Sequence, residues 1–197
     1  MSKMKYLRPE EKGRLFCSLD TDGRRHAARN RAIFYLAEYC GLRISEVCSL
    51  KIDDYNPATA TIYCTRMKNG NDNTLRIIDR RVINAMESYL AMRNEMYKDS
   101  EYLFISQRGG KLSRKSLDKI MKYHSERADL SAVKSHFHTL RHTRAVELAD
   151  YGFDTKDIQW WLGHKRIDTT TIYMQFTTKQ QDSIYDRLAC AMKDKDD

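Results

Sequence analysis

Residues 135–176 read SHFHTLRHTRAVELADYGFDTKDIQWWLGHKRIDTTTIYMQF and place two histidines, an arginine and a tyrosine at spacings suited to phosphate chemistry. His138 and Arg141 are three residues apart, so on a helix they share one face. A guanidinium fork matches two phosphate oxygens, and an imidazole exchanges protons near neutral pH. His164 follows at a predicted helix end. Tyr173 comes nine residues later in a threonine-rich turn, where we expect an exposed nucleophile.

The same stretch predicts three helices. One covers residues 139–151 and ends at Gly152, and the next covers residues 156–162 with Thr155 as its cap. The third is expected to begin at residue 168 or 169 and carries the tyrosine.

The stretch CGLRISEVCSL (40–50) joins two further predicted helices. Residues 29–40 have apolar side chains at helical spacing and stop at Gly41, and Ser45 is expected to cap a short second helix. Arg43 therefore lies in a sharp junction with packed neighbours on both sides, which suits an arginine that clamps a ligand. The alternative is an arginine that only bonds helix carbonyls.

A small sheet is predicted near the middle of the chain. Residues 59–65 and 74–78 are rich in β-branched and aromatic side chains, and Asn69-Gly70 between them is typical of a hairpin turn. Lys68 lies at the mouth of that hairpin, although a lone loop lysine is usually just solvated. Residues 102–106 are expected to form the third strand. The predicted fold class is mainly α with a small three-stranded antiparallel sheet.

The remaining segments predict helices at residues 7–19, 80–97, 114–128 (capped by Ser113) and 179–192. Basic side chains crowd two of the helix starts and are candidates for phosphate contacts, with a solvated helix surface as the alternative: Arg24, Arg25, His26, Arg29, Arg31, Arg114, Lys115, Lys119 and Lys122.

Composition agrees with a polyanionic partner. The 197 residues carry 35 Lys and Arg against 27 Asp and Glu, a net charge of +8, and fit one large domain. The five cysteines are scattered without a paired motif, which is typical of reduced thiols in a cytosolic protein. The N-terminus resembles no export signal, and no apolar run is long enough to span a membrane.

The candidate groups together meet the needs of phosphodiester cleavage. Two arginines neutralise the charge that builds on the phosphate, a tyrosine attacks, and a lysine protonates the departing 5′-hydroxyl. No metal or cofactor is needed. Zinc binding by His138 and His142, four residues apart, is the alternative, but the neighbouring Arg141 and Arg144 would oppose a cation.

Some residues in these stretches have a structural interpretation instead. His142 is interpreted as a buried, hydrogen-bonded histidine. Trp160 and Trp161 are candidates for base stacking, but their helical spacing favours at least one in the core. The other candidate nucleophiles lack the short fixed distance from a Gly-His pair: Tyr63, Tyr151 and Tyr185.

These motifs resemble the tyrosine recombinases, or phage integrase family, over about residues 7–185. CGLRISEVCSL resembles the first arginine motif of the family, HTLRH its His-x-x-Arg motif, LGH its second histidine motif and TTTIY its nucleophile motif. All four occur in the family's order and spacing. The hairpin motif departs from the family, because KNGNDNTLRII is longer and lacks a proline.

The resemblance implies a role for each residue. Arg43 and Arg141 would bind the scissile phosphate, and His164 would hydrogen-bond it. His138 would help to deprotonate Tyr173, which would attack and form a 3′-phosphotyrosyl link. Lys68 would protonate the leaving 5′-hydroxyl, and no cofactor or metal is implied.

The resemblance also implies an organisation and partners. Residues 1–197 would be a single catalytic domain, with a core at 7–176 and, at 177–197, a C-terminal helix and tail exchanged with a neighbouring subunit. There would be no separate N-terminal core-binding domain. The initial methionine and charged tail favour a full-length chain over an excised fragment. We expect a homotetramer on double-stranded DNA with inverted-repeat sites, DNA-bending accessory proteins, and a cytoplasmic, nucleoid-associated location in bacteria.

Short single-domain members of the family include the fimbrial phase-variation invertases, and residues 23–54 look like them. The predicted function is therefore a site-specific DNA recombinase that inverts a short element such as a fimbrial promoter switch. The alternatives are an integrase or excisionase of a mobile element, a DNA-binding regulator that keeps the recombinase fold, and a relaxing enzyme of the type IB topoisomerase kind.

Overall fold

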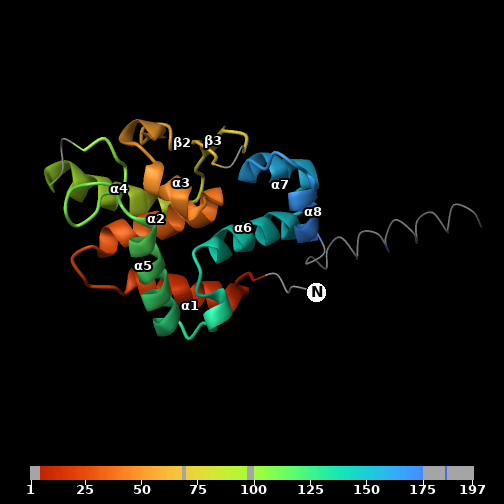
Figure 1. Cartoon of the computed structure of the whole chain (residues 1–197), viewed down its shortest axis with the longest axis horizontal. Coiled ribbons are helices and arrows are strands. Elements are labelled where there is room, and N and C mark those ends of the chain that lie inside the picture. Colours follow the sequence, from red (N-terminus) through yellow and green to blue (C-terminus); the bar gives the residue numbers. More distant parts are fainter. Residues whose placement is uncertain (1–4, 68–69, 97–99, 175–184, 186–197) are drawn as a thin grey trace, which may run out of the picture.

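The chain folds mainly into helices, with a three-stranded antiparallel sheet at one side, and so confirms the predicted fold class (Figure 1). The computed structural model describes residues 5–67, 70–96, 100–174 and 185. The α-helices are α1 (Pro9–Asp20), α2 (Ala27–Cys40), α3 (Ile44–Ser49), α4 (Arg80–Met96), α5 (Arg114–Arg127), α6 (His138–Asp150), α7 (Thr155–Leu162) and α8 (Asp168–Met174). The strands are β1 (Tyr55–Asn56), β2 (Thr61–Cys64) and β3 (Asn73–Arg76), and two 3₁₀ turns are η1 (Ile52–Asp54) and η2 (Ala132–Lys134).

The predicted hairpin is present, but the predicted third strand is wrong. β2 pairs with β3, and the third strand is β1, in which Tyr55 faces Ile62. Residues 102–106 do not join the sheet; Leu103 instead donates its backbone N–H to the carbonyl of Leu50 at 2.9 Å. The apolar run from Leu103 to Ile105 is buried without alternation, so it lies in the core instead of forming a strand with one exposed face.

Two predicted helix caps are also wrong. The N-cap of α3 is Arg43 and not Ser45, and the carboxylate of Glu46 accepts the Arg43 backbone N–H at 2.9 Å. The N-cap of α7 is Asp154 and not Thr155, since the Asp154 side chain accepts the N–H of Asp157 at 2.8 Å. In both cases a carboxylate near the helix start satisfies an otherwise free donor.

The predicted stop of one helix at Gly41 and the predicted cap of another at Ser113 are confirmed. Gly41 ends α2 with a left-handed φ of 61°, and Ser113 caps α5 by accepting the Ser116 N–H at 3.1 Å. Gly163 ends α7 in the same left-handed way, with a φ of 64°. Both glycines lie next to candidate site residues, so the chain reverses direction at the site itself.

The buried apolar side chains form two clusters. The main core surrounds α2, where Ile33, Phe34 and Leu36 are fully buried. The second, which we call the C-terminal cluster, lies where α6, α7 and α8 meet at one end of α6 (Figure 1) and consists of Ala145, Val146, Leu148, Ala149, Ile158, Leu162 and Tyr173. Trp161 packs against both clusters and therefore joins them.

Within the described residues, no helix has the length and apolar character needed to cross a membrane. The predicted last helix, at 179–192, lies outside the described residues except for Tyr185.

Candidate active site

Arg141 is the most enclosed of the candidate residues. It projects from the first turn of α6, is 1% exposed, and donates Nη1 to the carbonyl of Gly41 at 2.5 Å and Nη2 to the carbonyl of Leu162 at 2.8 Å. Burial, followed by the charge of Arg43, lowers the pKa of Arg141 to about 9. The guanidinium stays charged at neutral pH, and it would be stabilised by an arriving anion.

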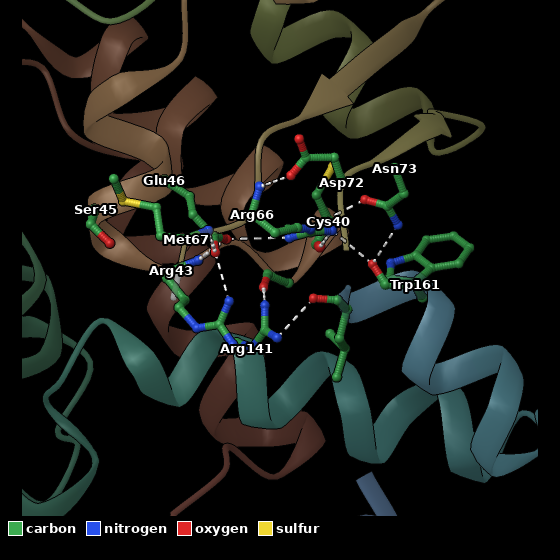
Figure 2. Close-up of polar contacts among 12 residues, drawn as sticks. Cys40, Arg43, Ser45, Glu46, Arg66, Met67, Asp72, Asn73, Arg141 and Trp161 are labelled. Atoms are coloured by element: carbon green, nitrogen blue, oxygen red, sulfur yellow. Dashed lines mark hydrogen bonds and ion pairs between the residues drawn. The ribbon is translucent and has the colours of Figure 1, made fainter. Parts of the chain in front are cut away.

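Arg43 approaches the same place from the α2–α3 junction, as predicted. Its Nη1 donates to Oε1 of Glu46 at 2.7 Å (Figure 2). The Arg43 side chain is 21% exposed. Burial favours a raised pKa for Glu46, but the Arg43 backbone N–H and the charge of Arg66 outweigh it and lower the pKa. Glu46 is therefore an anion that holds Arg43 in position.

His138 lies on the same face of α6 as Arg141. Its ring meets the ring of His142 edge to face, with centroids 4.4 Å apart. The residue reaches the surface, yet desolvation by its neighbours, followed by the electrostatic effects of His142 and Arg141, lowers the pKa of His138 to about 4. His138 is thus neutral at physiological pH and can accept a proton.

His164 follows the left-handed Gly163 and is 7% exposed. Its Nδ1 lies 2.7 Å from Oγ1 of Thr170. Burial, then the charges of Arg141 and Arg43, lower the pKa of His164 to about 3. A neutral ring fixed through Nδ1 leaves Nε2 as its second polar atom.

Tyr173 is buried at 2% exposure, so the prediction of an exposed nucleophile is wrong. Its hydroxyl lies 3.0 Å from Nδ1 of His142, and its ring is nearly parallel to that of His164, with centroids 6.4 Å apart. Burial raises the pKa of Tyr173, while Arg141 and Arg43 act against this rise. Tyr173 is buried because its ring completes the C-terminal cluster.

His142 is hydrogen-bonded, as predicted, but it is half-buried instead of buried, and its partner is the hydroxyl of the candidate nucleophile. Sequence reasoning missed this contact. The only available signal was that His142 follows His138 by one helical turn, because Tyr173 lies 31 positions further along the chain.

The structure brings Arg43, His138, Arg141, His164 and Tyr173 together. Lys68 lies outside the described residues. Tyr63, Tyr151 and Tyr185 are exposed at 44%, 66% and 69%, and no contact places them among these groups in the described part of the chain. No group of three or more metal-binding side chains is found among the described residues.

The two tryptophans differ, in line with the prediction that at least one is structural. Trp160 is 57% exposed, whereas Trp161 packs between the clusters and donates Nε1 to the carbonyl of Tyr39 at 2.9 Å.

A basic cleft of about 1010 Å³ lies between the start of α2, the 106–113 loop and the first turns of α5. None of the described residues that line it is acidic, and its cations include Arg24, Arg25, Arg108, Lys111 and Lys119. Arg29, predicted to face a phosphate or solvent, is instead 5% exposed and donates Nη1 to the carbonyl of Ile105 at 2.9 Å. α5 also packs against α3, the helix that begins next to Arg43.

A family model described as the phage integrase family matches residues 5–180. The chain belongs to this family, the tyrosine recombinases. It is 35% identical over 163 residues to the type 1 fimbriae regulatory protein FimB of Escherichia coli strain K12, a match that covers 82% of this chain and 80% of FimB. It is 33% identical over 177 residues to the tyrosine recombinase XerC of Caldanaerobacter subterraneus subsp. tengcongensis, covering 89% of this chain and 48% of XerC.

Solved structures agree with this tyrosine recombinase fold. The crystal structure of XerA recombinase matches with a TM-score of 0.79 and 29% identity, over 95% of this chain and 65% of that one. The XerH site-specific recombinase bound to palindromic difH substrate in a post-cleavage complex matches with a TM-score of 0.77 and 25% identity, over 92% of this chain and 52% of that one. This recombinase chain thus spans about half the length of XerC and of the XerH chain.

Proposed function

We propose that this tyrosine recombinase cleaves and rejoins DNA at specific sites through a covalent 3′-phosphotyrosyl intermediate. The observation that carries the proposal is the convergence of two arginines, two neutral histidines and one tyrosine from four separate helical segments. That set supplies a phosphate clamp, a proton acceptor and a nucleophile.

In the proposed cleavage step, Arg43 and Arg141 hold the non-bridging oxygens of the scissile phosphate, and His164 donates a hydrogen bond from Nε2. The Tyr173 oxygen forms a bond to phosphorus while its proton passes to His138. The bond from phosphorus to the 5′-oxygen breaks, and Lys68 protonates that oxygen. Rejoining runs the same steps in reverse with the 5′-hydroxyl of a partner strand.

The nucleophile has to move before this step. Its hydroxyl bonds His142 and is shielded from solvent in the present arrangement. We therefore assign the structure to a resting form, in which α8 holds Tyr173 away from DNA. Release of one hydrogen bond and of part of a small apolar cluster is a modest requirement.

The proposed partner is double-stranded DNA with inverted-repeat sites, bound by a tetramer together with DNA-bending proteins. The basic cleft supplies cations for the phosphate backbone beyond the scissile position. The proposed domain organisation is a single catalytic domain whose C-terminal segment, 177–197, docks on a neighbouring subunit.

We further propose that the reaction inverts a short DNA element such as a fimbrial promoter switch. The support is the similarity to the type 1 fimbriae regulatory protein FimB, at 35% identity over 82% of this chain. The same site would serve an integrase or excisionase equally well, so DNA flanking the gene should be tested for inversion first.

Covalent trapping tests the reaction class. Wild type, Tyr173→Phe and the control Tyr151→Phe would be mixed with flanking DNA that carries a nick, so that the cleaved piece diffuses away, and run on a denaturing gel. We expect a shifted band for wild type and Tyr151→Phe and none for Tyr173→Phe. An adduct that persists in Tyr173→Phe would overturn the assignment.

Other outcomes identify the alternatives. Tight, salt-sensitive binding with no cleavage on any site would indicate a DNA-binding regulator. Rapid relaxation of any supercoiled plasmid by a monomer would indicate chemistry of the type IB topoisomerase kind.

A further inference from the structure

Arg66 is a buried arginine that the proposed chemistry does not use. It follows β2, lies two residues before Lys68, and is 4% exposed, with no exposure of its side chain. A fully buried charge is costly unless it is paired and hydrogen-bonded. The contacts of the Arg66 guanidinium therefore indicate the role of this side chain.

The guanidinium of Arg66 joins four segments of the candidate site (Figure 2). Nη1 donates to Oε2 of Glu46 at 3.3 Å, and Nη2 donates to the carbonyls of Cys40 at 3.2 Å and Trp161 at 2.7 Å. Nε donates to Oδ1 of Asn73 at 3.1 Å. These partners lie at the end of α2, in α3, at the end of α7 and in β3.

The backbone on both sides of Lys68 is fixed by the same network. The N–H of Arg66 donates to Asp72 at 2.6 Å, and the N–H of Met67 donates to Oε1 of Glu46 at 3.1 Å. On the other side, the N–H of Asn71 donates to the carbonyl of Gly163 at 3.1 Å. The hairpin is thus tied to the carboxylate that holds Arg43 and to the turn that carries His164.

The packing around Arg66 leaves little room for adjustment. A Cβ added to Gly163 would lie 2.5 Å from Cγ of Arg66, and one added to Gly70 would lie 2.7 Å from its Cβ. Gly70 and Gly163 therefore pack directly against the aliphatic part of the Arg66 side chain. The hairpin cannot shift relative to the end of α7 without breaking these contacts.

Arg66 also sets the charge of the clamp. Glu46 is shared between Arg43 and Arg66, and Arg141 lies beside them. Three guanidinium groups and one carboxylate leave a net charge of two positive units, since His138 and His164 are neutral. Without Arg66, Glu46 would neutralise most of the charge that Arg43 offers to a phosphate.

We propose that Arg66 is a positioning residue of the recombination reaction, which docks the Lys68 hairpin onto the His164 turn and shares Glu46 with Arg43. Arg66 does not touch the DNA. It acts by docking the described arms of the hairpin, Arg66–Met67 and Asn71–Asn73, on the site, so this inference rests on the proposed function, in which Lys68 is the general acid.

The chemistry of the leaving group distinguishes a positioning role from a merely structural one. Loss of a merely structural arginine would slow cleavage of substrates with different leaving atoms equally. A 5′-oxygen needs a proton as it departs, whereas a 5′-sulfur leaves as a thiolate without one, because thiols are far more acidic than alcohols. Loss of the hairpin's docking should therefore slow cleavage of the oxygen substrate, which needs the proposed general acid Lys68, and largely spare the sulfur substrate.

The experiment measures single-turnover cleavage of nicked DNA with either a 5′-bridging oxygen or a 5′-bridging sulfur. We expect the sulfur-to-oxygen rate ratio to rise about ten-fold or more in Arg66→Gln and to rise in Lys68→Ala. It should stay at the wild-type value in Arg93→Gln. Arg93 is a matched control, because it is 2% exposed, donates to the carbonyls of Ser100 and Tyr102, and lies at the far end of α4.

An unchanged ratio in Arg66→Gln beside a raised ratio in Lys68→Ala would overturn this proposal alone. An unchanged ratio in Lys68→Ala would overturn the role of Lys68 and this inference with it, while adduct formation by wild type would still support the reaction class. If Arg66→Gln does not fold, Arg66→Lys replaces it, because lysine keeps the positive charge but cannot make the several hydrogen bonds of a guanidinium. The sulfur-to-oxygen rate ratio of that variant then tests the proposal in the same way.

Discussion

The arginine cluster (Arg43, Glu46, Arg66 and Arg141) and the corner that holds Tyr173 are built in opposite ways. In the cluster, the guanidinium groups are fixed by a carboxylate and by four backbone carbonyls from two segments, residues 40–41 and 161–162. Tyr173 is held by apolar packing in a small cluster and by one hydrogen bond to His142. Under the proposed function, this difference means that the arginines that would bind the phosphate are fixed before DNA arrives, whereas Tyr173, the proposed nucleophile, is held by contacts that can be released.

The largest effect that follows from this difference is expected for Arg141→Gln. Removing the guanidinium takes one arm from the clamp and leaves the carbonyls of Gly41 and Leu162 without their donor. We expect cleavage to fall at least about 1000-fold and the free energy of unfolding to fall by about 2–4 kcal/mol. Single-turnover trapping and urea denaturation measure the two quantities.

Arg93→Gln again serves as the control for a buried arginine outside the cluster. It should lose a similar amount of stability, about 2–4 kcal/mol, with an unchanged cleavage rate in the folded protein. If Arg141→Gln and Arg93→Gln lost the same fraction of the cleavage rate, Arg141 would act only as an ordinary buried arginine and not as a phosphate ligand.

An intermediate effect is expected for the pH dependence of stability, through His164. Its folded pKa of about 3 lies below the ordinary value of 6.5. Between pH 6.5 and about 3 the unfolded chain therefore binds a proton that the folded chain does not. The contribution of His164 to the free energy of unfolding is fully present above pH 6.5 and falls on acidification, by at most about 1.4 kcal/mol per pH unit.

The measurement compares wild type with His164→Asn in urea between pH 7 and pH 5, because another group acts in the opposite direction in this window. Burial raises the pKa of Glu38 to about 7, so Glu38 favours the folded state as the pH falls. Glu38 is common to both proteins, and the difference between them isolates the histidine. If the free energies of unfolding of the two proteins changed in parallel with pH, His164 would not be held neutral in the folded state.

The smallest effect is expected for His142→Leu. The variant removes the hydrogen-bond partner of the Tyr173 hydroxyl and should lower the free energy of unfolding by about 1 kcal/mol. Adduct formation should change by less than about five-fold, because the hydrogen bond stores the nucleophile and is not made in the reaction. His142→Asn, which can offer an amide oxygen, is the matched control; a roughly 100-fold loss in His142→Leu would instead make His142 a proton acceptor.

The sequence predicted the parts of this fold that depend on local patterning. The helices α2, α4, α5 and α6, the β2–β3 hairpin and the stop at Gly41 follow from periodicity and from glycine chemistry. The prediction of the third strand was wrong because the buried apolar run at 103–105 has the composition of a strand, but its segment makes only isolated bridges, Tyr102 to Lys51 and Ile105 to Lys111, and none to the sheet.

Sequence motifs predicted the residues that converge in the described part of the chain, but not how they are held, and Lys68 lies outside that part. Motif spacing pointed to Arg43, Arg141 and Tyr173, since each lies in a short recognisable segment. Glu46 and Arg66 were missed because charged side chains are rarely fully buried, and nothing local shows that they pair across 20 positions. The burial of Tyr173 likewise depends on tertiary packing.

The contacts that fix the clamp have a consequence for the order of events during synthesis. Arg66 bonds a carbonyl 95 positions later, and Arg141 bonds one 100 positions earlier. A ribosome-bound chain that has not yet reached residue 162 lacks the acceptors at the end of α7, so neither arginine can be fully fixed. Closing such long loops is among the slower steps of folding. A chain shorter than 162 residues therefore carries both arginines without their full set of acceptors. Under the proposed function, the capacity to cleave DNA would arise only after residue 162 has been made.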